Sequence, residues 1–266
     1  MKIALFDMDG TLTEARQQIK PEMIDALDAL SYSCDIGIVT GSEISYVMEQ
    51  LSDWILGSSG GRARFFPCNG TQEWLFRGDR GFERIYNVSM TDAIGENKLR
   101  ELCEFLLQQQ LLCMSDFPEM PAVGDFIVNR RSMLNYCPPG RSCSLEQREK
   151  FKVLDKRRSL RANVFRRLKT FMDREGSGCV AALGGNTSID VYPIGWDKTY
   201  VLRHFCDLEL VSFVGDRCTE GGNDKTLFDA INNPMSYGCG VAFKTQSTEQ
   251  TINIIDNKLI PFFRQK

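Results

Sequence analysis

Apolar residues follow a regular rhythm along the first third of the chain. Short apolar runs are expected to form buried strands, whereas Ile24, Leu27 and Leu30 are spaced to share one helical face. The predicted elements are a strand at residues 3–6, a helix from Pro21, a strand at 36–39 and a helix at about 44–51. Strands that alternate with helices indicate a parallel α/β sheet.

The last third of the chain repeats this rhythm. The predicted elements are a short strand at 190–192, a helix opened by GWDK at 195–198, a strand at 210–214 and a helical tail at about 252–260. The strand at 210–214 is almost wholly apolar and ends on Gly215 and Asp216. Because both outer thirds have the same pattern, we expect them to form one α/β domain.

The middle of the chain has a different pattern. Strand-like segments at 126–128 and 133–136 lie between a helix at about 96–110 and one long helix at about 144–174. This is typical of an α+β insertion. We therefore predict a core domain made of residues 1–85 and 191–266, with an α+β cap domain at 86–190 inserted between its halves.

Composition and charge argue against several classes of protein. The 266 residues are 42% hydrophobic and 25% charged with a net charge of −3, so nucleic acid is a poor default partner. The basic residues of 144–174 are better explained as a solvated face, since the aromatic residues there fall mostly on the apolar stripe. No apolar run approaches the ~20 residues of a membrane span, and an early acid argues against a signal peptide.

The cysteines and the single histidine predict no zinc site. Ten cysteines are present without a C-x-x-C pair, and His204 is expected to be structural or exposed. We expect reduced, mostly buried thiols and a cytoplasmic protein.

The stretch FDMDGTLT at 6–13 places two acids directly after the first predicted strand. Asp7 and Asp9 point to the same side of an extended segment, beyond the strand end where ligands bind in open α/β sheets. A metal loop, a nucleophile with its acid/base partner and a polar turn are all compatible with this pattern. An EF-hand is not, because Leu12 and Gln18 occupy its glycine and glutamate positions.

Three later signals favour chemistry over a simple turn. Hydroxyls follow the second strand at Thr40 and Ser42, and Lys198 stands at a predicted helix start. Asp216 and Asp224 lie in a glycine-rich turn after the strand at 210–214. Each signal alone is weak, since hydroxyls and Asp commonly cap helices, but their order along the chain is informative.

DMDGT, Ser42, Lys198 and Asp216 with Asp224 resemble the four motifs of the haloacid dehalogenase superfamily of phosphotransferases. The resemblance implies a Rossmann-like parallel-sheet core. It implies that Asp7 is the nucleophile that becomes an aspartyl-phosphate and that Asp9 is the general acid/base. Ser42 and Lys198 would hold the phosphoryl group. The implied Mg²⁺ ligands are Asp7, Asp9 through its backbone carbonyl, Asp216 and Asp224.

The inserted segment points to one family within this superfamily. RRSMLNYCPPGRSCS at 130–144 and GGNTSIDVYPIGWDKTY at 184–200 resemble the eukaryotic-type phosphomannomutases, and the likeness extends from Lys2 to about Phe228. In that family the phosphate-binding residues correspond to Arg16, Arg130, Arg141, Arg148, Ser188 and Asp190. Local physics supports part of this, because the capping-box pattern SLEQ at 144–147 would place Arg148 in a first helical turn, a good anion site.

The resemblance implies a Mg²⁺-dependent enzyme that interconverts mannose 6-phosphate and mannose 1-phosphate for GDP-mannose synthesis. It would use a hexose 1,6-bisphosphate as activator and form a homodimer through its cap. A sugar-phosphate phosphatase on the same scaffold is the alternative, and a non-catalytic phosphosugar-binding protein is a weaker one.

Several positions depart from the family pattern. Cys68 stands where the family has an acid before Asn-Gly, and Arg131 and Ser132 replace an Asn-Gly pair. The segments 73–82 and 229–234 are longer than usual. These changes affect the expected sugar preference and a second cation site near Phe228 more than the expected reaction.

Overall fold

The structure is a computed structural model that describes residues 1–233 and 240–264. The chain divides into two compact units. The core unit consists of Met1–Asn87 and Gly195–Lys266, and the inserted unit of Val88–Ile194. Pro234, the last residue of the altered stretch at 229–234, lies outside the described residues.

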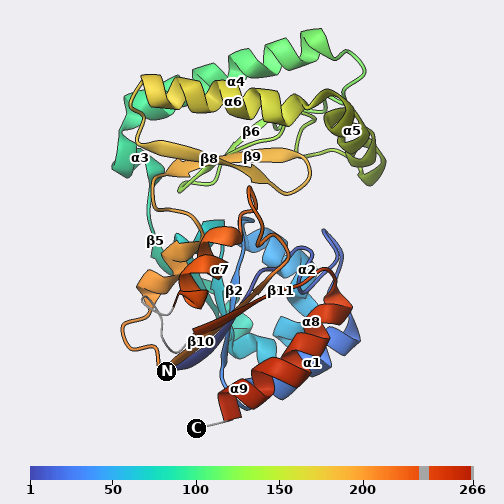
Figure 1. Ribbon diagram of the computed structural model, residues 1–266, viewed down its shortest axis with the longest axis vertical. Coiled ribbons are helices and arrows are strands. Elements are labelled where there is room, and N and C mark those ends of the chain that lie inside the picture. Colours follow the sequence, from blue (N-terminus) through green and yellow to red (C-terminus); the bar gives the residue numbers. More distant parts are fainter. Residues whose placement is uncertain (234–239, 265–266) are drawn as a thin grey trace. The chain divides into compact units, whose positions relative to one another are not determined.

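A seven-stranded sheet organises the core unit (Figure 1). Its order is β11-β10-β1-β2-β3-β4-β5, parallel from β11 to β3 and antiparallel from there to β5. The strands are β1 (Lys2–Phe6), β2 (Asp35–Val39), β3 (Arg64–Phe66), β4 (Gln72–Phe76), β5 (Phe82–Asn87), β10 (Leu210–Gly215) and β11 (Gly240–Lys244). Strand β1 therefore lies between two parallel neighbours, β10 and β2, as a βαβ pattern requires.

Alternation along β1 supplies both faces of this sheet with apolar side chains. Ala4 and Phe6 belong to the cluster that the first group of helices covers, whereas Ile3 and Leu5 belong to the cluster on the other face. The first group comprises α1 (Pro21–Ser31), α2 (Ile44–Gly57), α8 (Thr248–Ile254), the π-helical turn Ile255–Leu259 and α9 (Ile260–Arg264). The second comprises the 3₁₀ helix η4 (Lys198–His204) and α7 (Lys225–Asn232).

The inserted unit is an antiparallel sheet covered by helices. The sheet has the order β6-β7-β9-β8, with β6 (Ile127–Asn129), β7 (Leu134–Tyr136), β8 (Cys179–Gly184) and β9 (Ser188–Pro193). Figure 1 shows the helices α4 and α6 side by side across the sheet. The helices are α3 (Met90–Ile94), α4 (Glu96–Asp116), α5 (Leu145–Arg158) and α6 (Leu160–Arg174).

The expected long helix at 144–174 is wrong, because the chain forms two helices there. Ser159 adopts a left-handed conformation with φ 53° and ψ 37°, which ends α5 and allows α6 to start in a new direction. The apolar residues Leu154, Leu160 and Val164 are buried as expected. The capping box at the start of α5 is confirmed, with Ser144 and Gln147 bonding to each other's backbone N–H groups.

The remaining predicted elements are present, and most are longer than expected. The strand expected at 190–192 as part of the α/β domain is β9, which instead pairs with β7 and β8 in the inserted unit. The sequence pattern did not indicate the strands β3, β4, β5, β8 and β11, nor the helices α3 and α7. Short 3₁₀ turns lie at η1 (Ser59–Arg62), η2 (Cys68–Gly70) and η3 (Gly78–Arg80). Within the part of the chain that the structure describes, no helix is long and apolar enough to cross a membrane.

Candidate active site

Parallel pairing at the centre of the core sheet brings the first and last acidic motifs to one edge. The backbone N–H of Asp7 donates to the carbonyl of Val214 at 2.9 Å, which extends the β1–β10 ladder by one residue. Asp216 follows directly after β10. Both carboxylates therefore emerge at the carboxyl end of the sheet, where ligands bind in folds of this class.

Lys198 connects Asp7 with a third acid, Asp224. Its side chain is fully buried, and its Nζ forms ion pairs with Asp7 and with Asp224, which is also fully buried. Asp197 caps η4 by accepting a hydrogen bond from the N–H of Thr199 at 2.8 Å, which fixes where Lys198 enters the site. A buried lysine is tolerated here because both of its partners are anionic.

Three carboxylates form a cluster suited to a cation. Asp7, Asp216 and Asp224 each offer an oxygen, and these oxygens lie within 4.8 Å of one another. Oδ1 of Asp216 is buried without a hydrogen-bond partner among the described residues. A divalent cation would satisfy that oxygen, and a set of carboxylate oxygens matches the preference of Mg²⁺. The residues present therefore fit a magnesium ion.

Burial and neighbouring charges shift the pKa values of this cluster. Burial, followed by the charge of Asp224, raises the pKa of Asp7 well above its ordinary value and raises that of Asp216 to about 6. Burial alone would lower the pKa of Lys198, but the charges of Asp224 and Asp7 outweigh it and raise that pKa. Three acids facing one lysine are short of positive charge, which a bound cation would supply.

Gly10 allows the loop after β1 to pass close to this cluster. Its φ of 87° lies in the region that favours glycine, and a Cβ at this position would lie 2.6 Å from Oδ2 of Asp216. The loop closes on itself through the N–H of Gly10, which donates to the carbonyl of Thr13 at 2.7 Å.

The side chain of Asp9 lies outside the three-carboxylate cluster. Its Oδ1 accepts hydrogen bonds from the backbone N–H of Arg16 and from Nε2 of Gln50, both at 3.2 Å. Gln50 is itself buried and accepts a hydrogen bond from the hydroxyl of Thr13 at 2.7 Å. Two donors thus orient the Asp9 carboxylate. That its carbonyl binds a cation stays a prediction.

Ser42 is held at the end of β2 by a neighbouring loop. Its N–H donates to Oγ1 of Thr40 at 3.0 Å, and its carbonyl accepts from the N–H of Cys68 at 3.0 Å. Cys68, Asn69 and Gly70 are successive left-handed residues with φ of 52°, 63° and 84°. Sequence reasoning missed Gln50. A polar residue on the apolar face of α2 was the available signal for Gln50.

The ring of His204 has a structural role, because both of its nitrogens contact neighbouring residues. One ring nitrogen lies 2.7 Å from the carbonyl of Gly70, and the other lies 3.2 Å from a carboxylate oxygen of Glu73. Burial lowers the pKa of the ring. His204 thus supports the loop that holds Ser42.

In the inserted unit, the predicted phosphate-binding residue Arg148 contacts the backbone of a second one, Arg141. Arg148, in the first turn of α5, donates from Nη2 to the carbonyl of Arg141 at 3.1 Å. Its Nη1 donates to the hydroxyl of Thr187 at 3.1 Å. These contacts place a guanidinium beside a helix N-terminus, which is a favourable site for an anion.

The other predicted residues occupy separate places. Ser188 and Asp190 are buried on β9, where Asp190 accepts a hydrogen bond from Asn135 at 2.5 Å. Arg130 is buried in the same unit, with Nη1 3.9 Å from the sulfur of Met133. Arg16 lies in the core unit with a φ of 61°, and its guanidinium stands 4.7 Å from the ring centre of Tyr46.

Comparison of the structure with solved structures supports the fold. The IMP-bound IMP-nucleotidase of Plasmodium falciparum matches with a TM-score of 0.62 at 13% identity, covering 98% of this chain and 68% of that one. The trehalose-6-phosphate phosphatase of Aspergillus fumigatus matches with a TM-score of 0.54 at 15% identity, covering 98% and 92%. Likeness at such low identity shows the haloacid dehalogenase fold alone.

Comparison of the sequence with known proteins identifies the family as well as the fold. A probable phosphomannomutase of Caenorhabditis elegans is 37% identical over 230 residues, which is 85% of each chain. Phosphomannomutase 1 of the mouse is 35% identical over 243 residues, covering 90% of this chain and 86% of that one. A family model described as eukaryotic phosphomannomutase matches residues 23–260, a span that includes Lys198 and the inserted unit but begins after Asp7. The chain therefore belongs to the eukaryotic phosphomannomutase family.

Proposed function

We propose that this protein is a Mg²⁺-dependent phosphomannomutase that interconverts mannose 6-phosphate and mannose 1-phosphate. The observation that carries the proposal is the buried contact of Lys198 with Asp7 and Asp224 beside Asp216, in a member of this family. Phosphoryl transfer depends mainly on positioning and on neutralising charge, and this arrangement serves both needs.

Asp7 is the proposed nucleophile. Its carboxylate attacks phosphorus, the bond between phosphorus and the sugar oxygen breaks, and an aspartyl-phosphate remains on the enzyme. Because burial raises the pKa of Asp7, Lys198 must keep this carboxylate ionised and near the phosphoryl oxygens. Mg²⁺, held by Asp7, Asp216, Asp224 and the carbonyl of Asp9, would neutralise charge on the transferring group. Ser42 would donate a hydrogen bond to that group.

Asp9 is the proposed general acid and base. It protonates the leaving sugar oxygen and later takes the proton from the hydroxyl that attacks the aspartyl-phosphate. The hydrogen bonds from Gln50 and from the backbone of Arg16 support this role because both hold one oxygen of the carboxylate in place.

The inserted unit is the proposed cap, which binds the phosphate that is not reacting. Arg141 and Arg148 would grip it, with Arg130, Ser188 and Asp190 contacting the substrate and Arg16 contributing from the core. A hexose 1,6-bisphosphate would turn end for end between two transfers and act as activator. We further propose a cytoplasmic homodimer, joined through the cap, that feeds GDP-mannose synthesis.

A coupled assay tests this proposal. Purified protein receives mannose 1-phosphate, Mg²⁺ and trace hexose 1,6-bisphosphate, and formation of mannose 6-phosphate is followed together with release of free phosphate. The proposal predicts isomerisation that bisphosphate stimulates, with little phosphate release. Phosphate release without isomerisation would instead identify the phosphatase alternative, and binding without turnover would identify a non-catalytic protein.

A further inference from the structure

One ion pair connects the two helices α5 and α6 in the inserted unit. Nε of Arg161 donates to Oδ2 of Asp155 at 2.8 Å, and the two side chains are only 13% and 12% exposed. Oδ1 of Asp155 also accepts the backbone N–H of Arg161 at 2.7 Å, so that the same carboxylate caps the first turn of α6. The left-handed Ser159 makes this possible because it turns the chain between the two residues.

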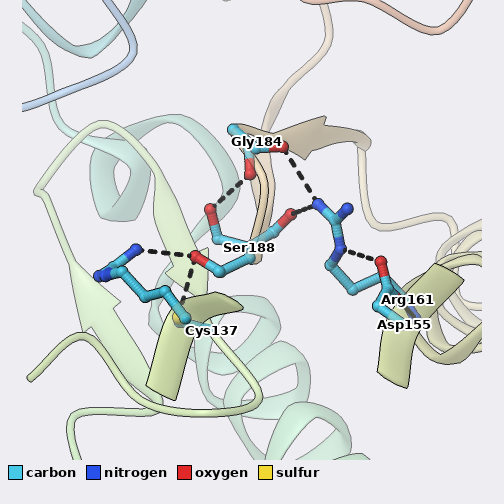
Figure 2. Close-up of polar contacts among 8 residues, drawn as sticks. Cys137, Asp155, Arg161, Gly184 and Ser188 are labelled. Atoms are coloured by element: carbon cyan, nitrogen blue, oxygen red, sulfur yellow. Dashed lines mark hydrogen bonds and ion pairs between the residues drawn. The ribbon is translucent and has the colours of Figure 1, made fainter. Parts of the chain in front are cut away.

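Arg161 extends from this pair to the turn between β8 and β9. Its Nη1 donates to the carbonyl of Gly185 at 3.2 Å and to that of Ser188 at 3.3 Å (Figure 2). A planar guanidinium carries donors on separate nitrogens, so it can hold a carboxylate and two carbonyls at once. A lysine has a single nitrogen and cannot span these acceptors. Arg161 thus ties the turn to the start of α6.

The turn at 184–188 carries groups of the proposed phosphate site. The hydroxyl of Thr187 accepts from Nη1 of Arg148 at 3.1 Å, and the hydroxyl of Ser188 donates to the carbonyl of Gly184 at 2.8 Å. Arg148 in turn holds the carbonyl of Arg141. Displacement of the turn would therefore move Thr187 and break its hydrogen bond with Nη1 of Arg148.

We propose that Asp155 and Arg161 are positioning residues that set the geometry of the phosphate site through the β8–β9 turn. This inference rests on the proposed function of the inserted unit. A buried ion pair contributes little net stability compared with apolar packing, but it fixes geometry. Here the geometry that it fixes belongs to Arg148, which would touch the phosphate, whereas Asp155 and Arg161 would not.

The conservative variants Arg161→Lys and Asp155→Asn test the inference. From the usual strength of charge-assisted hydrogen bonds, we expect each variant to raise KM for mannose 1-phosphate and Kd for hexose 1,6-bisphosphate about tenfold. The kcat of each variant should stay within about twofold of the original value. Hydrolysis of p-nitrophenyl phosphate, which carries no second phosphate for the proposed cap site, should stay unchanged. Glu149→Gln is the matched control, because it removes an acid from an exposed α5 pair with Lys152, and it should alter none of these quantities.

Arg148→Ala separates this inference from the proposed function. If Arg148→Ala leaves KM and bisphosphate binding unchanged, the proposed cap site is wrong. If Arg148→Ala weakens binding but Arg161→Lys and Asp155→Asn do not, the positioning role is wrong and the proposed function stands. In the double variant Arg148→Ala with Arg161→Lys, the second change should add little further loss, because both act on the same contact. Loss of thermal stability with unchanged KM would also overturn the positioning role.

Discussion

Removing one carboxylate from the acidic cluster should stabilise the metal-free protein. In Asp216→Asn the side chain keeps its shape, loses its charge and gains an N–H group that can donate to Asp7 or Asp224. The pKa of Asp216 rises from an ordinary 3.8 to about 6, chiefly through burial. A difference of about two pKa units corresponds to about 3 kcal/mol of unfolding free energy. Partial exposure to solvent reduces this to about 1–2 kcal/mol.

The pH dependence has a definite sign. Because the folded protein binds the Asp216 proton more tightly than the unfolded chain does, this group favours folding below pH 3.8, and the advantage is lost as pH rises through about 6. In EDTA, the original protein should therefore lose stability between pH 5 and 7.5 relative to Asp216→Asn. Urea unfolding at both pH values measures the difference.

Mg²⁺ should reverse the order of stability, so that the original protein becomes more stable than Asp216→Asn. A ligand that binds only the folded state stabilises it in proportion to its affinity, so Mg²⁺ should raise the stability of the original protein more than that of Asp216→Asn. The reasoning would be refuted if Asp216→Asn were the less stable protein in EDTA at pH 7.5. Equal stabilisation of both proteins by Mg²⁺ would place the cation elsewhere.

Three further changes test other contacts. Gln50→Ala removes a hydrogen bond to Asp9 and should lower kcat about tenfold with KM little changed; an unchanged kcat measured over pH 5–9 would show that Gln50 does not orient the acid/base. Gly10→Ala places a methyl group 2.6 Å from a carboxylate oxygen of Asp216, and titration should show weaker Mg²⁺ binding. Ser159→Gly suits a φ of 53° and should raise the unfolding free energy by about 0.5–1 kcal/mol, because relief of the left-handed strain exceeds the greater entropy that glycine loses on folding. A lower value in denaturant unfolding would argue that the serine side chain is needed there.

The fold class of the core unit could be predicted from the sequence, because β1, β2 and β10 are apolar runs that indicate buried strands, but β3, β4, β5 and β11 were not predicted. The apolar pattern of β1 and β10 is local, and parallel pairing then follows from the alternation with helices. The break between α5 and α6 was missed because basic residues on both sides are good helix formers. The six-residue step from Leu154 to Leu160 departs from helical spacing and was the available signal.

The candidate site was predictable to a similar extent. Asp7, Lys198 and Asp224 stand out because each follows a strand or begins a helix, and the structure brings these three together. Contacts between distant segments leave no local trace. Gln50 reaches Asp9 across 41 residues, and its role is visible only in three dimensions. The basic segment at 144–174 also gives no sign that Arg161 binds the turn between β8 and β9.

Transfer through Asp7 is the central claim, and one experiment tests it most directly. Protein is incubated with hexose 1,6-bisphosphate and Mg²⁺, and intact-protein mass spectrometry is combined with the mannose 1-phosphate assay for the original chain and for Asp7→Asn. The account predicts one added phosphoryl group and bisphosphate-stimulated isomerisation in the original chain, and neither in Asp7→Asn. Isomerisation that persists in Asp7→Asn would contradict it.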